Sequence, residues 1–440
     1  MLSWRGALGV RVRARTWAGE AMGSSSSLVR VLGVLGLLVA LQGGACGEDR
    51  DPPRGGGSGD AGVDLDAGVD ADPGDTDPGN PDAEDDAVDD AGEADVVDDA
   101  QVDGGGSDAD ADLLPECVED ADCGRSGVCG QGGVCLTRLR VATWNLEGIG
   151  EEGSEQFEAT LAVIRRLGAE VMLVQEVNGE ADVAAFARLA ILAGYPHTAL
   201  TPEGTFGPQR NGVLSALALE AVQVHTAESL SGTPGANDIT RPLLTARVRP
   251  AGAEPLTLAV HHAKSGASNL DEFRQVCEAI RLTQALSGFD AGRDAYVLVG
   301  DFNEEINTGT RSPEVFTAPP EGLLEGFVLG PDLEEIMARG EMINNPFIYL
   351  QRRGGLEMVA LDATQVGGAV GTRPESGRRI DYILVSPALA ARGPAAEVYY
   401  AANEALGGGL SKRPPALAAG VSEVASDHLP VFADLLLSRR

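Results

Sequence analysis

From about residue 138 to the C-terminus, the chain alternates short apolar runs with amphipathic stretches, and this alternation restricts the fold more than any other feature. The segments 156–167 and 269–287 have the period of helices. Runs rich in Val, Ile and Leu between and around them have the length of buried strands: "LRVATWN", "EVMLVQEV", residues 256–262 and 295–300, "RIDYILVS" and "PVFADLLL". Strands that alternate with helices predict an α/β domain. Periodicity alone does not say whether the strands form one sheet or two.

The predicted strands share a second property, because each ends at or near an acid, an amide or an imidazole. These side chains are Asn145, Glu176, His262, Asp301 with Asn303, Asp381, and Asp427 with His428. A buried, unpaired charge costs on the order of several kcal/mol, and a cap or turn explains one such residue more easily than a whole series. Strand ends at one sheet edge converge in space, so we expect a cluster. Oxygen ligands of this kind select magnesium, calcium or manganese over zinc.

Residues 1–46 have the layout of a signal peptide. Arg30 precedes a short apolar run, 31–41, and small residues follow it up to Cys46. The run is shorter than the roughly 20 apolar residues that a membrane-spanning helix needs. A start at Met22 would give the basic region an ordinary length. Cys46 resembles the lipidated cysteine of bacterial lipoproteins, although Gly43 stands where that motif prefers Leu, so lipid anchoring and plain cleavage with release both stay open.

Residues 47–114 form an acidic tract. Residues 1–135 hold 8 Lys and Arg against 29 Asp and Glu, a balance of 8 − 29 = −21 out of the chain's −34. A stretch of this composition buries too little apolar surface to offset the entropy of ordering its backbone. Calcium binding is an alternative, but the spacing does not match a calcium-binding loop. We therefore predict a disordered, self-repelling spacer.

Four evenly spaced cysteines in residues 115–137 predict a small disulfide module. They are Cys117, Cys123, Cys129 and Cys135. Zinc sites usually use CxxC pairs, so two disulfides in an exported, Gly-rich segment are the better interpretation. Three connectivities are possible. Cys277 lies in a helical pattern and is expected to be a buried small hydrophobe.

Six segments together resemble the endonuclease/exonuclease/phosphatase superfamily, whose best-known member is pancreatic-type deoxyribonuclease. They are "ATWNLEG", "VMLVQEV", "VHHAKSG", "VLVGDFNEE", "RRIDYILVSP" and "SDHLPVFADL". They occur in the family's order and spread over nearly all of residues 138–440. The resemblance implies an α/β (α+β) four-layer sandwich, in which two packed β-sheets are flanked by helices.

The resemblance also implies catalytic roles. His428 matches the general base that activates water, and Asp381 matches the acid that orients and charges that imidazole. His262 matches a second catalytic histidine, which assists the phosphate and the leaving group. Asp301 and Asn303 match the central pair that holds the nucleophile and a phosphoryl oxygen. An imidazole held by a carboxylate is a usual source of activated water at neutral pH.

Metal-binding and substrate-binding roles follow in the same way. Glu176 matches the family's principal metal-binding acid, Asn145 its neighbour at the metal and phosphate, and Asp427 a further acid beside the metal, with Asp301 contributing as well. The implied cofactor is Mg²⁺, with Mn²⁺ or Ca²⁺ as alternatives. Arg241, in "NDITRPLL", resembles an arginine that contacts phosphate and precedes a proline.

Three parts of the chain depart from the pattern or lie outside it. The deoxyribonucleases pair the equivalent of His262 with an acid, and here Glu203, Glu220 and Glu228 are only its neighbours in sequence. Strand alternation points His261 to the opposite face, while His197 and His225 are expected to be structural or surface groups. The segment 310–355 carries no recognised motif and predicts an insertion beside the site.

Membership of such a superfamily does not fix the substrate. "HHAKSG", then a long helix, then "GDFNEE" most resembles secreted bacterial endonucleases, so nucleic acid is the first expected substrate. Against this, residues 136–440 have a balance of 25 − 38 = −13, although nucleic-acid binders usually carry a basic footprint. A local basic patch remains available from Arg352, Arg353, Arg378, Arg379 and Lys412.

Two alternatives stay open. A sphingomyelinase, a phospholipase or an inositol-phosphate phosphohydrolase of the same fold is the first, and a lipid-directed enzyme of this kind predicts an exposed apolar hairpin, for which "NPFIYL" (345–350) is the candidate. A catalytically inactive binding scaffold is the second, although such a module has no need of the acids and histidines. We expect an exported protein, periplasmic, surface-anchored or extracellular, and no segment indicates a protein partner.

Overall fold

The computed structural model describes residues 117–124, 127–306 and 314–440. The predicted signal peptide (1–46), the lipidation candidate Cys46 and the acidic linker (47–114) lie outside these residues. Within the described part of the chain, no helix is both long enough and apolar enough to cross a membrane.

The first sheet contains the N-terminal and C-terminal strands of the α/β domain. Its order within the described residues is β14-β15-β2-β3-β5-β4, with β1 paired to the start of β2. The pair β2 and β3 is parallel and the other neighbours are antiparallel. The bounds are β1 Gly127–Cys129, β2 Cys135–Asn145, β3 Val171–Asn178, β4 His197–Leu200, β5 Gln209–Ser215, β14 Ala395–Val398 and β15 Val431–Ser438.

The second sheet is built from the middle of the chain. Its order within the described residues is β12-β13-β9-β8-β7-β6, and β8 and β9 form its parallel pair. The bounds are β6 Glu220–His225, β7 Leu243–Val248, β8 Leu256–His262, β9 Tyr296–Asp301, β12 Val359–Ala360 and β13 Asp381–Val385. The two sheets confirm the predicted strands and answer the question that periodicity left open.

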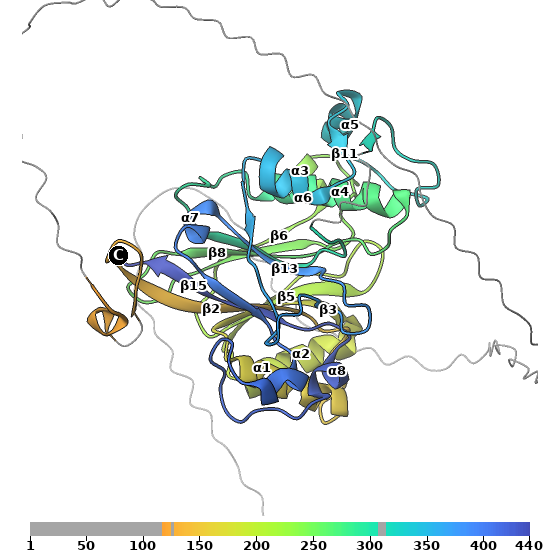
Figure 1. Cartoon of the computed structure of the whole chain (residues 1–440). Coiled ribbons are helices and arrows are strands. Elements are labelled where there is room, and N and C mark those ends of the chain that lie inside the picture. Colours follow the sequence, from red (N-terminus) through yellow and green to blue (C-terminus); the bar gives the residue numbers. More distant parts are fainter. Residues whose placement is uncertain (1–116, 125–126, 307–313) are drawn as a thin grey trace, which may run out of the picture. The chain divides into compact units, whose positions relative to one another are not determined.

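The two sheets pack face to face and helices cover both outer faces, as Figure 1 shows. Apolar residues of β2, β3, β8 and β9, such as Val141, Val171, Val260 and Val299, fill the space between the sheets. Trp144 and Phe432 turn to the other face of the first sheet and pack against helices. These helices are α1 Glu155–Leu167, α2 Gly179–Ala193 and α8 Val421–Ala425. The predicted four-layer α/β sandwich is therefore confirmed.

The helical layer on the second sheet centres on α4 (Asn269–Ala285), whose N-cap Ser268 accepts a hydrogen bond from the Asp271 amide. The predicted insertion, 310–355, packs against this helix as far as it is described. Its elements are β10 Val315–Phe316, α5 Pro331–Ala338, β11 Met342–Ile343, α6 Pro346–Ile348 and η2 Tyr349–Arg353. The remaining helices are η1 Asp120–Cys123, α3 Ala227–Ser231, α7 Pro387–Ala390 and η3 Ala401–Leu406.

The segment "NPFIYL" is part of the protein core and is not an exposed hairpin. Phe347, Tyr349 and Leu350 are 2%, 6% and 0% exposed. Phe347 packs against Phe302 and Tyr382 of the second sheet. The candidate for a membrane-contacting hairpin is thus wrong, because its aromatic side chains fill the space between the insertion and the sheet.

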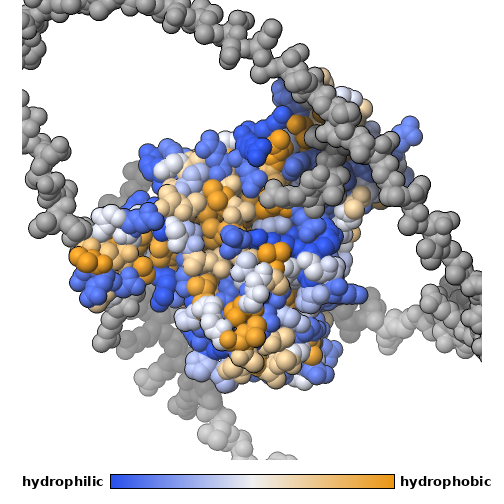
Figure 2. Space-filling model, in the orientation of Figure 1, coloured by the Kyte–Doolittle hydropathy of each residue, from blue (hydrophilic) through white to orange (hydrophobic). Residues whose placement is uncertain are grey.

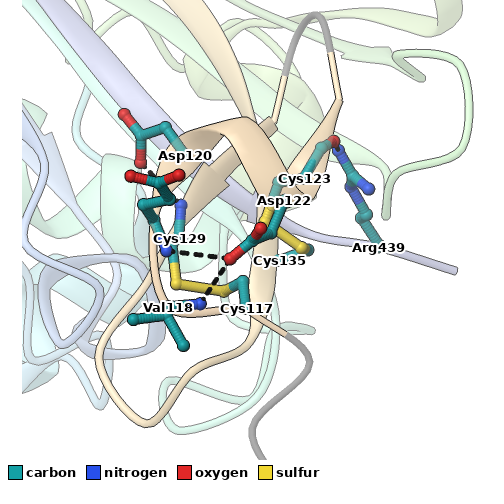
Figure 3. The surroundings of a disulfide bond; sticks show 9 residues. Cys117, Val118, Asp120, Asp122, Cys123, Cys129, Cys135 and Arg439 are labelled. Atoms are coloured by element: carbon teal, nitrogen blue, oxygen red, sulfur yellow. Dashed lines mark hydrogen bonds between the residues drawn. A yellow bond between two sulfur atoms is a disulfide. The ribbon is translucent and has the colours of Figure 1, made fainter.

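The cysteine module holds two disulfides, Cys117–Cys129 and Cys123–Cys135 (Figure 3). This confirms the disulfide interpretation and selects one of the three connectivities. The module and the following α/β domain share a strand, since β2 begins at Cys135 and ends at Asn145. Arg439 also donates a hydrogen bond to the carbonyl of Cys123. Two disulfides are typical of a protein that folds in an oxidising, exported environment. Cys277 is a free, buried thiol, as expected.

A half-buried ion pair fastens the loop after β14 to the first helical layer. Arg166 of α1 donates two hydrogen bonds of 2.7 Å to the two carboxylate oxygens of Glu404, and the Tyr399 hydroxyl adds a third at 2.7 Å. The Arg166 hydrogen bonds are the main cause that lowers the pKa of Glu404 to about 2. A carboxyl with a lowered folded-state pKa stabilises the fold above its unfolded pKa, and this contribution is lost as the pH falls towards 2.

We therefore expect Glu404→Gln to lower the free energy of unfolding by about 1–3 kcal/mol at pH 7. The difference in the free energy of unfolding between wild type and variant should shrink as the pH falls from about 4.5 to about 2. Urea unfolding at several pH values across this range measures this difference. A difference that stays constant with pH would contradict an ionic origin.

Candidate active site

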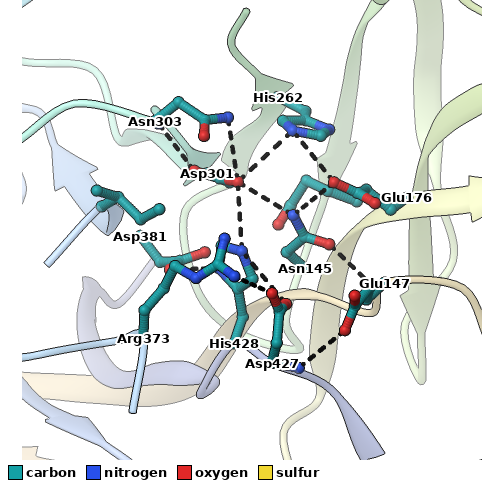
Figure 4. Close-up of polar contacts among 12 residues, drawn as sticks. Asn145, Glu147, Glu176, His262, Asp301, Asn303, Arg373, Asp381, Asp427 and His428 are labelled. Atoms are coloured by element: carbon teal, nitrogen blue, oxygen red, sulfur yellow. Dashed lines mark hydrogen bonds and ion pairs between the residues drawn. The ribbon is translucent and has the colours of Figure 1, made fainter. Parts of the chain in front are cut away.

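The predicted polar residues meet at one edge of the two packed sheets (Figure 4). Asn145, His262 and Asp301 are the last residues of β2, β8 and β9. Asp381 is the first residue of β13, which runs antiparallel to β9 and pairs Asp381 with Asp301. His428 comes just before β15, which is antiparallel to β2. The topology therefore brings strand ends and strand starts from both sheets to the same edge.

The Asp301 carboxylate lies at the centre of this cluster. Its Oδ2 atom is 3.0 Å from Asn145 Nδ2, 3.5 Å from His262 Nε2 and 3.7 Å from His428 Nε2. Asn303 donates its backbone N–H to Asp301 Oδ1 at 2.8 Å. Burial, followed by the nearby Asp381 carboxylate, raises the pKa of Asp301 to about 7. A cation in the cluster would favour the ionised form, because opposite charges lower a carboxyl pKa.

His428 and Asp381 form the second buried pair. His428 Nδ1 lies 2.9 Å from Asp381 Oδ2, and both side chains are almost fully buried. Burial lowers the pKa of His428, but the carboxylate and hydrogen bond of Asp381, helped by Asp301, outweigh it and raise the pKa to about 9. The pair fixes the ring with Nε2 directed towards Asp301. A base must be neutral, so positive charge bound at Asp301 would assist it by lowering this pKa.

The donor set suits a divalent cation. One ligand atom each of Glu176, His262 and Asp301 lie within 4.8 Å of one another, as do those of Asp301, Asp381 and His428. Asn145 Nδ2 donates to Glu176 Oε1 at 3.0 Å and holds that carboxylate in the cluster. The carboxylate-rich donors would hold an oxygen-seeking ion, which would neutralise charge on a phosphate and polarise its P–O bonds.

Sequence reasoning missed two residues that the structure places in the cluster. The Glu147 carboxylate accepts the Asp427 amide at 3.2 Å, and burial, then the Asp427 carboxylate, raises the pKa of Glu147. Arg373 forms an ion pair with Asp427, as Figure 4 shows. Glu147 had a signal, since it stands two residues after Asn145 in "ATWNLEG". Arg373 had none, because it lies in a loop with no motif.

Unusual backbone conformations accompany the site. Glu147, Glu176 and Asn303 have positive φ angles of 49°, 59° and 53°. At Glu176 the register of β3 against β5 shifts, so a β-bulge redirects its side chain. Gly300 has a φ of 145°, and a Cβ there would lie 1.7 Å from the His261 carbonyl. Left-handed non-glycine residues are uncommon and concentrate at functional sites, where surrounding structure holds them.

Among the described residues, no carboxylate contacts His262 in the way that the deoxyribonucleases pair this histidine with an acid. Its Nδ1 atom is buried without a hydrogen-bond partner among the described residues. The three acids near it in sequence have other contacts: Glu203 pairs with Arg210, Glu220 pairs with Arg247 and Glu228 accepts a backbone N–H from Gly235. His262 instead faces Glu176 Oε1, at 3.5 Å from Nε2, as well as Asp301.

The other histidines lie where the sequence predicted. His261 points to the helical side of the sheet, where Nε2 is 3.8 Å from Glu278 of α4 and the ring lies edge-on to Phe302. His225 bonds to Thr245 at 2.9 Å, and His197 is a half-buried residue of the short strand β4.

Arg241 is placed beside the catalytic residues. It donates to the carbonyl of Ala263, the residue after His262, at 2.9 Å, and to Gln209. Its guanidinium lines a pocket together with Lys264. Of the basic residues expected to form a patch, three contact different parts of the molecule: Arg378 reaches the Asn303 carbonyl, Arg353 the Glu341 carbonyl, and Lys412 pairs with Glu397.

The fold and this cluster define a metal-dependent phosphoester hydrolase. The chain belongs to the Endonuclease/Exonuclease/phosphatase family, whose family model matches residues 142–428. That range runs from β2 to His428 and includes every predicted catalytic and metal-binding residue. No curated protein matches the chain in sequence.

Several solved structures resemble the chain. An endonuclease/exonuclease/phosphatase from Beutenbergia cavernae is 24% identical over 68% of this chain and 72% of that one, with a TM-score of 0.42. ANGEL2, a 2′,3′-cyclic phosphatase, is 16% identical over 68% and 95%, with a TM-score of 0.46. Truncated Caenorhabditis elegans TDP2 is 12% identical over 68% and 97%, with a TM-score of 0.39. At these values no substrate follows from the resemblance.

We expect Asp381→Asn to lower kcat by at least about 100-fold, because it removes the charge that supports His428 as a base. It should also lower the pKa of His428 in the metal-free protein from about 9, since Asp381 is the main group that raises it. NMR titration of the His428 ring with and without Asp381 measures this. An unchanged ring pKa would contradict the pairing.

Glu176→Gln is expected to weaken metal binding more than folding, because the amide keeps the shape of the side chain and removes its charge. The concentration of Mg²⁺ that gives half-maximal activity should rise about 10-fold or more. A Mg²⁺ titration of hydrolysis, with isothermal calorimetry on the same samples, provides the measurement. Equal metal affinity in both proteins would exclude Glu176 as a ligand.

Proposed function

We propose that this protein is an exported endonuclease that hydrolyses DNA or RNA with Mg²⁺. The observation that carries the proposal is a cationic pocket of about 400 Å³ that begins beside the catalytic residues. Arg241, Lys264 and Arg274 line it, and Asp271, the one acid among the lining residues, forms an ion pair with Lys264 at 2.8 Å, which leaves the two arginines as the uncompensated charges of the lining. The pocket therefore concentrates positive charge in a domain that is acidic overall, as binding of a second phosphate requires.

The same pocket offers a surface for a nucleobase. Phe206 is 36% exposed, and the centre of its ring lies 4.7 Å from the guanidinium carbon of Arg274. The centre of the Phe327 ring lies 5.6 Å from the same carbon. Leu323 and Leu324, from the insertion, form another part of the lining. A planar aromatic ring beside bound phosphate is typical of proteins that stack the bases of single-stranded nucleic acid.

The reaction assigned to the site is attack of water on phosphorus. His428 accepts the proton of the water, and Asp381 stabilises the resulting imidazolium. Asn145 and Asn303 lie beside Asp301, where their amide N–H groups can contact phosphoryl oxygens once substrate displaces their present partners. His262, on the other side of Asp301, is placed to assist the leaving oxygen, and Arg241 lies next to that end of the site.

The lipid alternative has less support. The segment proposed as its membrane-contacting hairpin is buried, with Leu350 fully so. On the face drawn in Figure 2, hydrophobic residues are interrupted by hydrophilic ones. An interfacial enzyme needs a continuous apolar surface to enter a membrane.

Export and anchoring form a separate part of the proposal. We propose that Cys46 is lipidated, so that the acidic tract holds the enzyme away from a membrane. Wild-type cells labelled with radioactive palmitate should yield a labelled protein, and Cys46→Ser should not. Absence of label from both would leave cleavage and release as the mode of export.

Full-length protein incubated with plasmid DNA, RNA and sphingomyelin vesicles tests the substrate. We expect Mg²⁺-dependent cleavage of nucleic acid that stops with EDTA and in His428→Ala. Release of lipid headgroup without cleavage of nucleic acid would show that the same site hydrolyses a lipid phosphodiester. Inactivity on all three substrates would favour a binding scaffold.

A finer test addresses Phe206. We expect Phe206→Ala to raise KM for a single-stranded oligonucleotide about 5- to 150-fold, since base stacking contributes about 1–3 kcal/mol. KM for the same oligonucleotide with abasic sites next to the cleaved bond should change little. Equal effects on both substrates would contradict base stacking. Val222→Ala, an exposed apolar residue of β6, is the control.

A further inference from the structure

Helix α4 turns a charged and polar face towards the protein interior. Arg274, Gln275, Glu278 and Arg281 are 6%, 1%, 1% and 1% exposed. Burial of such groups costs free energy unless each one is paired. Arg281 is paired with Asp238 and Asp332, which ties the insertion to the helix. The other three contact the loop that carries Arg241 and the loop that follows His262 at the end of β8.

Glu278 joins these two loops. Its Oε1 accepts the backbone N–H of Thr240 at 2.8 Å, and its Oε2 accepts the backbone N–H of Lys264 at 2.8 Å. Thr240 directly precedes Arg241, and Lys264 is two residues after His262. One buried carboxylate therefore sets the spacing between the loop of the substrate-binding arginine and the end of the catalytic strand β8.

Neighbouring hydrogen bonds fix the same peptide from other sides. The Ala263 carbonyl accepts from Arg241 Nη1 at 2.9 Å and from Asn303 Nδ2 at 3.1 Å. The Lys264 carbonyl accepts from Gln275 Nε2 at 2.7 Å. A shift of residues 263–264 would therefore move Arg241, Asn303 and His262 together. Glu278 itself lies on the helical side of the sheet, where it touches His261.

We propose that Glu278 is a positioning residue for phosphoester hydrolysis, with Gln275 in support. Both loop groups that it binds are donors, and a carboxylate offers an acceptor oxygen to each. An amide would offer one oxygen and turn its NH₂ group against the second donor. The role concerns the family's hydrolysis at this site and does not depend on whether the natural substrate is nucleic acid.

The test uses Glu278→Gln in the full chain, with bis(p-nitrophenyl) phosphate as a simple phosphodiester. We expect kcat/KM to fall at least about tenfold, mainly through kcat, because reacting groups are displaced. The matched control is Asp434→Asn. Asp434 is also a buried carboxylate, bound by Arg140 at 2.6 and 2.8 Å, but it lies along β15 away from the site. The control should lower the melting temperature and leave kcat unchanged.

A double-mutant cycle separates positioning from general destabilisation. If Glu278 acts through the Arg241–Ala263 contact, then Glu278→Gln should lower kcat/KM by a much smaller factor in an Arg241→Ala background than in the wild-type protein. Additive effects, or a kcat/KM within about twofold of wild type, would overturn the proposal. Because the substrate is generic, failure of the nuclease proposal would leave this result unaffected.

A second variant covers the case in which Glu278→Gln does not fold. Gln275→Met removes the donor to the Lys264 and Gly266 carbonyls, and also a buried Oε1 atom that has no hydrogen-bond partner among the described residues, so we expect a smaller loss of stability than for Glu278→Gln. We expect kcat/KM to fall about three- to tenfold, with faster hydrogen exchange at the Lys264 amide than in wild type. Unchanged activity and exchange would count against the proposal.

Discussion

The buried Asp301 carboxylate brings the active site together. Asp301 is the last residue of β9. In the sheet register it lies opposite Asp381 of the neighbouring strand β13 and opposite His262 of the neighbouring strand β8. Asn145 reaches the same oxygen from the opposite sheet at 3.0 Å. A carboxylate buried in this way is costly unless donors or positive charge compensate it. The amide of Asn145 and the imidazoles of His262 and His428 surround one oxygen of this carboxylate, and a divalent cation bound here would add further compensation.

The same requirement explains the local backbone around the site. Glu147, Glu176 and Asn303 have left-handed conformations, each of which costs about 1–3 kcal/mol. The sheets that pack behind them supply enough buried apolar surface to hold these conformations. Gly300 allows β9 to approach the His261 carbonyl so closely that no other residue fits. Three of the five left-handed non-glycine residues in the described part of the chain therefore lie at the active site, while Ala221 in β6 and Glu357 lie elsewhere.

The surroundings of the catalytic cluster differ more from the family pattern than the cluster does. In the part of the chain that the structure describes, no acid contacts the Nδ1 atom of His262, and the insertion contributes Leu323 and Leu324 to the pocket beside Arg241. The polar face of α4 holds the loops on that side of the site, and Arg281 binds the insertion to the same helix. The positions of these loops and of the insertion thus depend on contacts with one helix.

The sequence determined the strands, the order of the motifs and the residues of the central cluster. These features are local, because both the spacing of apolar residues and a polar residue at a strand end can be recognised within a few consecutive residues. It also indicated disulfides and the four-layer fold, the latter through family resemblance. The tertiary structure decided which cysteines pair, that "NPFIYL" is buried, and that Glu147 and Arg373 join Asp427. It also decided that Glu278 binds loops 38 and 14 residues away in sequence. Those facts depend on contacts between segments far apart in the chain. The number of residues between two such segments does not determine how far apart they lie in the folded protein.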